Sequence, residues 1–259
     1  MDQLPTNVMT LIDYLSNYGA KCYIVGGWVR DCLLGINNND IDIEVFDIDY
    51  ESLLVLSKML DDNAKGFRKY GVVKLPNLGV DLSLPKYEIA NDESNYNKIR
   101  YKIDPHLSLK QASMRRDLSI NCIYYDPLTN EIIDPQLGVE DVINHRCRII
   151  NPNFSDDPVR LIRLIYYTVK YDLTIDQQVL DIIEPMLIDN ISEGKLRSYI
   201  NKIKSVDGYY QLLIDKGLLK KVEDYLWSST FSFLARFSLG NGLNGINLTL
   251  ISGCFDNLE

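Results

Sequence analysis

The chain has 259 residues, of which 46% are hydrophobic and 24% charged, and this balance excludes a disordered tail protein, a collagen and a long coiled coil. The 27 basic and 36 acidic residues give a net charge of −9. That charge excludes a wholly basic nucleic-acid coat, but it allows an enzyme that binds nucleic acid through a local basic face.

Up to about residue 150, short helix-like and strand-like patterns alternate. The predicted helices are 5–19, 28–34 and 51–62, and the predicted strands are 22–25, 40–46, 72–75, 80–84 and 118–125. Residues 86–106 are polar and aperiodic, and they are predicted to form a long loop.

From Asp157 onward the spacing is helical only. Pro158 suits the first position of a helix, so Asp157 is its predicted N-cap. Further helices are predicted over 176–188, 192–204 and 207–216. The sequence thus predicts an α+β fold, with a mixed head over 1–150, a helical neck over 151–227 and an unassigned segment over 228–259.

Cysteine and histidine usage bears on the compartment. The five cysteines are odd in number, no two have C-x-x-C spacing, and there are only two histidines. A disulfide framework and a structural zinc site are therefore not expected. With no basic signal-peptide start and no membrane-length apolar stretch, we expect a cytoplasmic protein without a membrane partner.

Gly26 and Gly27 stand between a predicted strand and a predicted helix. Glycines there let the backbone approach an anion, and the helix start offers free N–H groups. Arg30 follows within reach of phosphate oxygens. The alternatives are an ordinary strand-to-helix turn and a surface ion pair between Arg30 and Asp31.

Asp40 and Asp42 lie two apart on a predicted strand, so both carboxylates point to one side. Two like charges so close favour a shared cation, and oxygen ligands suit Mg²⁺. Asp81, in the next apolar strand, is the candidate third carboxylate. The alternatives are solvated surface positions, and we expect Glu44 to be simply solvated.

Two later segments combine charges that suit a nucleotide. Arg115, Arg116 and Asp117, with Asn121, can bind phosphate and ribose together, or they form a surface charge cluster.

Asp157 and Arg160 stand three apart on one helix face. A carboxylate and a guanidinium can satisfy the amino donor and ring-nitrogen acceptor of cytosine or adenine. Uracil and guanine would leave the acid unpaired. Capping alone also explains Asp157.

The order of these motifs closely resembles the class II tRNA nucleotidyltransferase and bacterial poly(A) polymerase superfamily. The resemblance covers roughly residues 20–225. The motifs that carry it are Gly26-Gly-Trp-Val-Arg-Asp-Cys-Leu-Leu-Gly35, Asp40-Ile-Asp42, Arg115-Arg-Asp-Leu-Ser-Ile-Asn121 and Asp156-Asp-Pro-Val-Arg160-Leu-Ile-Arg163.

This resemblance implies a nucleotidyltransferase-type catalytic head, a mixed sheet flanked by helices, followed by an all-α neck and short body. It implies that Asp40 and Asp42 hold Mg²⁺, with Asp81 as the third catalytic carboxylate. It further implies that Gly26, Gly27 and Arg30 take the triphosphate, that Arg115, Arg116, Asp117 and Asn121 handle ribose and phosphate, and that Asp157 and Arg160 read the base with Arg163 in support. The loop at 86–106 corresponds to the family's flexible element.

The sequence also departs from the family pattern. Asp156 stands where Glu is frequent, Gly194-Lys195 replaces an expected Glu-Arg pair, and Lys86 replaces an expected Arg, which costs a bidentate fork. The chain ends earlier than family members usually do. The candidate basic surface for RNA phosphates is Lys195, Arg197, Lys202, Lys204, Lys216, Lys220 and Lys221.

The expected activity is the template-independent addition of C and/or A to tRNA 3′ ends from CTP and ATP, with release of pyrophosphate. A poly(A) polymerase, or an enzyme that adds only CC or only A, is the alternative within the class. A non-catalytic nucleotide- or RNA-binding module is the alternative outside it.

Overall fold

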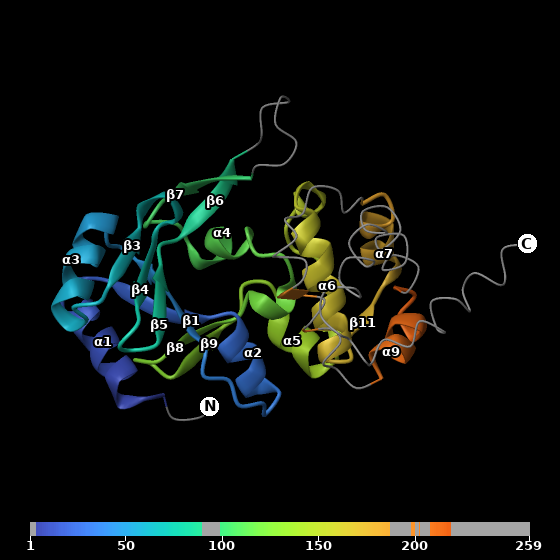
Figure 1. Ribbon diagram of the computed structural model, residues 1–259, viewed down its shortest axis with the longest axis horizontal. Helices are drawn as coiled ribbons and strands as arrows, with labels where there is room; N and C mark the ends of the chain where they lie inside the picture. The colour runs from blue at the N-terminus through green and yellow to red at the C-terminus, as the bar shows by residue number, and fades with distance from the viewer. Residues whose placement is uncertain (1–3, 90–98, 187–197, 200–201, 203–207, 219–259) are drawn as a thin grey trace, which may run out of the picture.

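A computed structural model describes residues 4–89, 99–186, 198–199, 202 and 208–218. The head is built on a seven-stranded mixed sheet in the order β3-β4-β5-β2-β1-β8-β9 (Figure 1). Its strands are β1 (Lys21–Val25), β2 (Ile41–Phe46), β3 (Lys65–Phe67), β4 (Val72–Leu75), β5 (Val80–Ser83), β8 (Tyr124–Asp126) and β9 (Glu131–Ile133).

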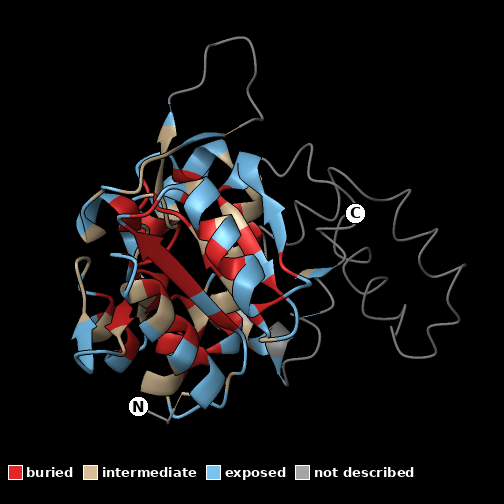
Figure 2. Ribbon diagram, turned by 90° about the vertical axis from the view of Figure 1, so that its left-hand side faces the viewer, coloured by how far each residue is buried: buried red, intermediate tan, exposed pale blue. Residues whose placement is uncertain are grey.

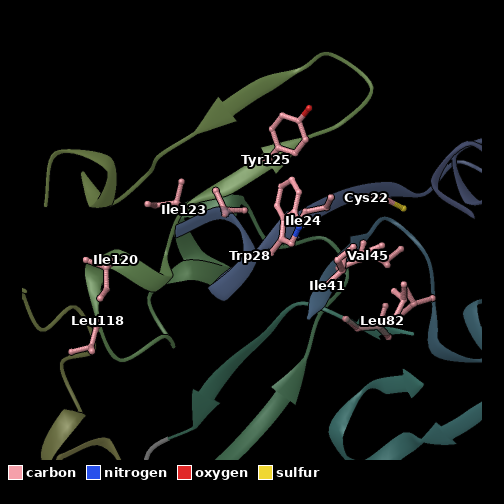
Figure 3. Packing of buried hydrophobic residues seen from close by; sticks show 14 of the residues in the cluster. Cys22, Ile24, Trp28, Ile41, Val45, Leu82, Leu118, Ile120, Ile123 and Tyr125 are labelled. Carbon is pink, nitrogen blue, oxygen red and sulfur yellow. The ribbon is translucent and has the colours of Figure 1, made fainter. Parts of the chain in front are cut away.

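Two helices cover the core face of this sheet. They are α1 (Thr6–Ser16) and α3 (Tyr50–Leu60). In α1 the buried residues Val8, Leu11, Ile12 and Leu15 recur at helical spacing, which explains why this segment packs as an amphipathic helix. From the sheet side, alternate residues of β1, β2 and β5 point into the same core. Figure 3 shows Cys22, Ile24, Ile41, Val45 and Leu82 among them.

The opposite face of the sheet is covered only in part. Helix α4 (Leu109–Ser113) lies over β1, β2 and β8 and closes a second, smaller apolar cluster of Val25, Phe46, Ala112 and Tyr124. Helix α2 (Gly27–Leu33) follows β1 directly, and its buried Trp28 and Val29 pack in the main core on the other face. Asp42 on this face stays exposed to solvent, as do Lys65 and Phe67 of β3 and Lys74 of β4.

Beside the head lie the helices of the neck, drawn yellow to orange on the right of Figure 1. They are α6 (Pro158–Lys170), α7 (Gln177–Ile183) and α9 (Tyr209–Asp215), preceded by α5 (Gly138–Ile143) and joined by the short parallel pair β10 (Arg146–Cys147) and β11 (Thr174–Ile175). Leu161 and Ile165 of α6 belong to the same buried cluster as Ile24 and Ile43 of the sheet. One apolar core therefore runs from the head into the neck, and Figure 2 shows the buried segments at the centre of the molecule.

Most predicted elements are confirmed, but two predictions are wrong. The predicted loop at 86–106 contains an antiparallel hairpin of β6 (Lys86–Ile89) and β7 (Arg100–Ile103), in which polar residues form strands because the two segments pair with each other. The predicted strand 118–125 is interrupted by a 3-10 turn, η2 (Ser119–Asn121), and only β8 remains extended.

Other predictions lie outside the described residues. These are the segment 228–259, most of the predicted helix 192–204, and the residues Gly194, Lys195, Arg197, Lys204, Lys220 and Lys221. Lys202 is described and exposed. In the described part of the chain, no helix combines the length and the hydropathy needed to cross a membrane.

Candidate active site

The three predicted carboxylates meet on the open face of the sheet. Asp42 is opposite Asp81 in the parallel register of β2 and β5, and Asp40 comes just before β2. Partial desolvation raises the pKa of Asp42, and the nearby carboxylates of Asp40 and Asp81 raise it further. Asp81 forms an ion pair with Lys74 across β4 and β5. The carboxylates of this cluster repel one another, and a bound cation would relieve that repulsion.

The residues present fit a magnesium ion that is completed by substrate. Among the described residues, no group of three or more His, Cys, Asp or Glu side chains is arranged around a metal position. Mg²⁺, however, is usually held by one or two carboxylates together with waters and substrate phosphates. Asp40 and Asp42, both exposed and on one side of β2, supply that pair.

Beside the carboxylates, β1 ends in the doubled glycine. Gly26 has φ 71° and ψ −123°, a backbone conformation that only glycine adopts without strain. A Cβ on Gly26 would lie 3.6 Å from Nη1 of Arg116, so a predicted phosphate-binding arginine lies directly against this turn. Val25, just before the turn, is opposite Asp42 in the β1–β2 register. The glycines, the arginine and the carboxylates therefore form one continuous site.

Arg30 lies beneath this site and is buried. Its Nε donates to Asp31 at 2.9 Å, its Nη2 donates to the Tyr171 hydroxyl at 2.6 Å, and its Nη1 donates to Asn121 Oδ1. The ion pair with Asp31 is present, but it is a buried pair and not the surface pair that the sequence suggested. All three guanidinium nitrogens thus have protein acceptors.

Asp117, Asn121 and Arg163 continue this polar network. Asp117 Oδ2 accepts from Nε of Arg163, and its Oδ1 accepts from the Leu118 N–H at 3.0 Å and from Asn121 Nδ2 at 3.3 Å. Burial alone would raise the pKa of Asp117, but Arg163 and these hydrogen bonds hold it below its usual value. The network connects α2, the η2 turn and α6.

Glu44 is a site residue that the sequence analysis missed. It is fully buried, not solvated. Oε1 accepts from Arg115 at 2.8 Å, and Oε2 accepts from the Tyr124 hydroxyl at 3.0 Å and lies 3.3 Å from Nη2 of Arg116. Burial would raise the pKa of Glu44, but the two guanidinium groups outweigh it and keep the pKa low. The ionised carboxylate of Glu44 therefore orients both arginines.

Lys86 stands beside the same arginines. Its Nζ donates to the Tyr70 carbonyl at 2.7 Å. Burial, together with the cations of Arg115 and Arg116, lowers the pKa of Lys86 to about 8. The site therefore gathers three basic side chains around a single buried carboxylate, with surplus positive charge for an anion.

The start of α6 is as predicted. Asp157 is the N-cap, and its Oδ1 accepts from the Val159 N–H at 2.9 Å, with Pro158 in the first helical turn. Arg160, one turn on, is buried. Its Nη1 donates to the Asn153 carbonyl at 2.6 Å, and its Nη2 pairs with Glu88 of β6. The fixed guanidinium and the capping carboxylate share one end of α6, next to the hairpin.

Comparisons with known proteins show what this chain is similar to. Residues 22–148 match the family described as Poly A polymerase head domain. A Multifunctional CCA protein of Mannheimia succiniciproducens is 29% identical over 212 residues, which are 77% of this chain and 48% of that protein. A Multifunctional CCA protein of Xylella fastidiosa is 36% identical over 143 residues, 55% of this chain and 33% of that protein. The chain thus spans a third to a half of the length of these relatives.

Solved structures share the fold. A CCA-adding enzyme in its apo form II superposes with a TM-score of 0.70 and 22% identity, covering 89% of this chain and 56% of that one. The Bacillus stearothermophilus CCA-adding enzyme in complex with CTP gives a TM-score of 0.66 and 22% identity, covering 83% and 53%. The Thermotoga maritima CCA-adding enzyme complexed with tRNA gives 0.65 and 21%, covering 85% and 53%.

Proposed function

Because the chain belongs to the superfamily of class II tRNA nucleotidyltransferases and bacterial poly(A) polymerases, we propose that it adds C and/or A to tRNA 3′ ends. The substrates are CTP and ATP, no template is used, and pyrophosphate is released. The observation that carries this proposal is the register of Asp42 with Asp81 on one side and with the Gly26 turn on the other. Such a transferase works in the cytoplasm, where tRNA and both nucleotides are available.

The carboxylates define the reacting end of the site. Asp40 and Asp42 would hold Mg²⁺, which supplies a lowered pKa for the attacking hydroxyl and charge neutralisation on the phosphate oxygens when bound. Asp81 already gives Oδ2 to Lys74, so its other oxygen is the acceptor for the tRNA 3′-hydroxyl. The product bond joins that hydroxyl oxygen to the α-phosphorus, and pyrophosphate leaves.

The basic side chains define the triphosphate end. Arg116 lies against the turn at Gly26, and Arg115 shares its partner Glu44. Both arginines, assisted by Lys86, would stabilise the charge of the phosphates. Arg30 acts indirectly. Its guanidinium donates to Asn121, and Asn121 together with Asp117 binds the ribose. The arginine donors are held by buried partners before substrate arrives, which is the preorganisation that catalysis needs.

Base selection is assigned to the start of α6. Asp157 Oδ1 is used by the cap, so Oδ2 accepts from the exocyclic amino group of cytosine or adenine. Arg160, held by Glu88, donates to the ring nitrogen, and Arg163 keeps α6 in place through Asp117. A uracil carbonyl would face the carboxylate, acceptor to acceptor, which disfavours UTP.

The test is turnover by the Asp42→Asn variant. We expect loss of CTP and ATP incorporation into tRNA that lacks its CCA end, because the variant removes a metal ligand. Thermal stability should be unchanged or higher, since the substitution relieves repulsion from Asp40 and Asp81. Asp13→Asn, an exposed acid on α1, is the matched control. Near-wild-type incorporation by Asp42→Asn would reject the proposed metal role.

The same assay separates the alternatives. Supplying CTP and ATP separately gives a product ladder that distinguishes CCA addition from CC-only or A-only addition and from poly(A) synthesis. Mg²⁺-dependent CTP binding without any pyrophosphate release would instead identify a non-catalytic nucleotide-binding module.

A further inference from the structure

The open face of the sheet extends well beyond the carboxylates, towards the edge strand β3. Residues opposite one another in the registers of β3, β4, β5 and β2 form a single row across the sheet, and directly opposite residues share a face. The members of this row are Lys65, Lys74, Asp81 and Asp42.

A second row lies two residues further along the same strands. It contains Phe67, Val72, Ser83 and Glu44. Phe67 is 42% exposed, so its ring is open to solvent on the sheet surface. The intervening residue, Gly66, faces the other way, because a Cβ there would collide with Tyr50 and Leu54 of α3. Lys65 and Phe67 therefore stand on the same side of the sheet as Asp42.

The two ends of the row differ in charge and in how far they are exposed to solvent. On the β1 side, the Gly26 turn, Arg115 and Arg116 take the triphosphate in the proposed function. On the β4 and β3 side, Lys65, Lys74 and Phe67 are exposed, in a chain whose net charge is −9. Lys74 is paired with Asp81, so Lys65 supplies the positive charge at the outer end of the row. The second substrate must bring its 3′-hydroxyl to Asp42 and Asp81 from a direction that the nucleotide does not occupy.

We propose that this surface, made of Lys65, Phe67 and Lys74, is the track on which the last nucleotides of the acceptor RNA approach the site. The inference rests on the proposed function and deepens it. Lys65 lies beside the phosphates of the strand, Lys74 lies between Lys65 and its own partner Asp81, and Phe67 offers a face on which a base stacks. Lys65 is three strands from Asp42, about 14 Å at the usual spacing of strands, a span that the end of an RNA strand can cover.

Charge reversal and ring removal test this track. The variants are Lys65→Glu and Phe67→Ala in the full chain, and the control is Lys58→Glu, an exposed lysine at the end of α3. The substrates are tRNA lacking its CCA end and CTP. We expect the KM for RNA to rise about tenfold in each variant, with kcat and the KM for CTP unchanged. Lys65→Glu should also flatten the dependence of RNA affinity on salt, and the control should behave as wild type.

Two results would overturn the track. One is a wild-type KM for RNA in both variants. The other is a rise in the KM for CTP in place of that for RNA, which would assign the surface to the nucleotide. RNA affinity measured without nucleotide separates this inference from the proposed function. A chain that binds RNA through Lys65 and Phe67 but never extends it would reject the activity and keep the track, whereas a chain that binds no RNA would reject both.

Discussion

Glu44 and Arg115 form a buried ion pair, with 2.8 Å between Oε1 and Nη2 and no solvent exposure of the Glu44 side chain. The two residues are 71 positions apart in the chain, so the pair ties β2 to the segment that follows α4. Arg116 shares the same carboxylate. The charge at the proposed phosphate-binding end of the site therefore depends on one buried acid.

The first prediction concerns that acid. In Glu44→Gln, two buried guanidinium groups lose their counter-charge, and we expect the free energy of unfolding to fall by about 3 kcal/mol. Urea denaturation at pH 7 measures the change. The control is Glu51→Gln, which removes an exposed pair with Arg68 and should change little.

The pH dependence of stability gives a second readout for Glu44. Its pKa is lower in the folded state than the ordinary value of 4.5, so its stabilisation is present above that value and is lost as the pH falls through the folded pKa. The variant should lack this acid-sensitive part. Equal stability of wild type and variant at pH 7 would contradict the role given to Glu44.

The second prediction tests whether Arg30 supports the fold or contacts the phosphates directly. Arg30→Lys cannot serve Asp31, Asn121 and Tyr171 at once, so we expect a loss of about 3 kcal/mol in unfolding free energy. The affinity of the folded protein for CTP should change less than the stability does. Isothermal titration with Mg²⁺ and CTP below the melting temperature measures it. A variant of normal stability that binds CTP ten times more weakly would instead indicate direct phosphate contact.

The third prediction concerns base selection at the N-cap of α6. Asp157→Ala removes the cap and should lower stability by about 1 kcal/mol, whereas Asp157→Asn keeps a good cap and should not. Both variants change the acceptor that faces the base, so both should incorporate UTP more readily relative to CTP and ATP. Primer extension with single nucleotides checks this. Full exclusion of UTP by both variants would remove Asp157 from base reading.

The fourth prediction uses Lys86, whose pKa is about 8 in the folded protein against 10.5 ordinarily. As the pH rises through 8, Lys86 loses the charge that assists Arg115 and Arg116, so CTP binding should weaken between pH 7 and 9. Lys86→Arg stays charged over this range and should bind CTP independently of pH. A matching decline in wild type and Lys86→Arg would contradict the assignment.

Lys86 also affects stability with a definite sign. Between pH 8 and 10.5 the unfolded chain carries a proton on this lysine that the folded chain has lost, so folding stability contributed by Lys86 rises with pH in that window. Denaturation curves at pH 8 and pH 10 would show the rise in wild type, and Lys86→Met should not show it.

Sequence reasoning placed the candidate-site residues correctly in the fold where the signals are local. Alternation along β2 predicts the exposed Asp42, and Pro158 predicts the cap at Asp157, because both signals lie within a few residues. The same alternation was wrong for Glu44, since its partners Arg115 and Arg116 come from a distant segment. Arg30 likewise donates a hydrogen bond to the hydroxyl of Tyr171, which lies 141 positions later in the chain. Burial of a charge by remote partners leaves no periodic signature in either segment.

The edge of the sheet shows the same limit. β3 has only three residues, too few for a recognisable alternation, and it becomes a strand because β4 pairs with it. The sequence of the hairpin β6–β7 is polar and predicts a loop, and its two strands form because they pair with each other.

The contacts from Arg30 through Asn121 and Asp117 to Arg163 limit where the chain can be truncated. A fragment trimmed to residues 22–148 would lack Arg163 and Tyr171, so the buried Asp117 would lose its ion-pair partner and the buried Arg30 would lose one of its three acceptors. Such a fragment would be a poor crystallisation target or minimal catalyst. A fragment that folds on its own must therefore retain α6, although the family match ends at residue 148.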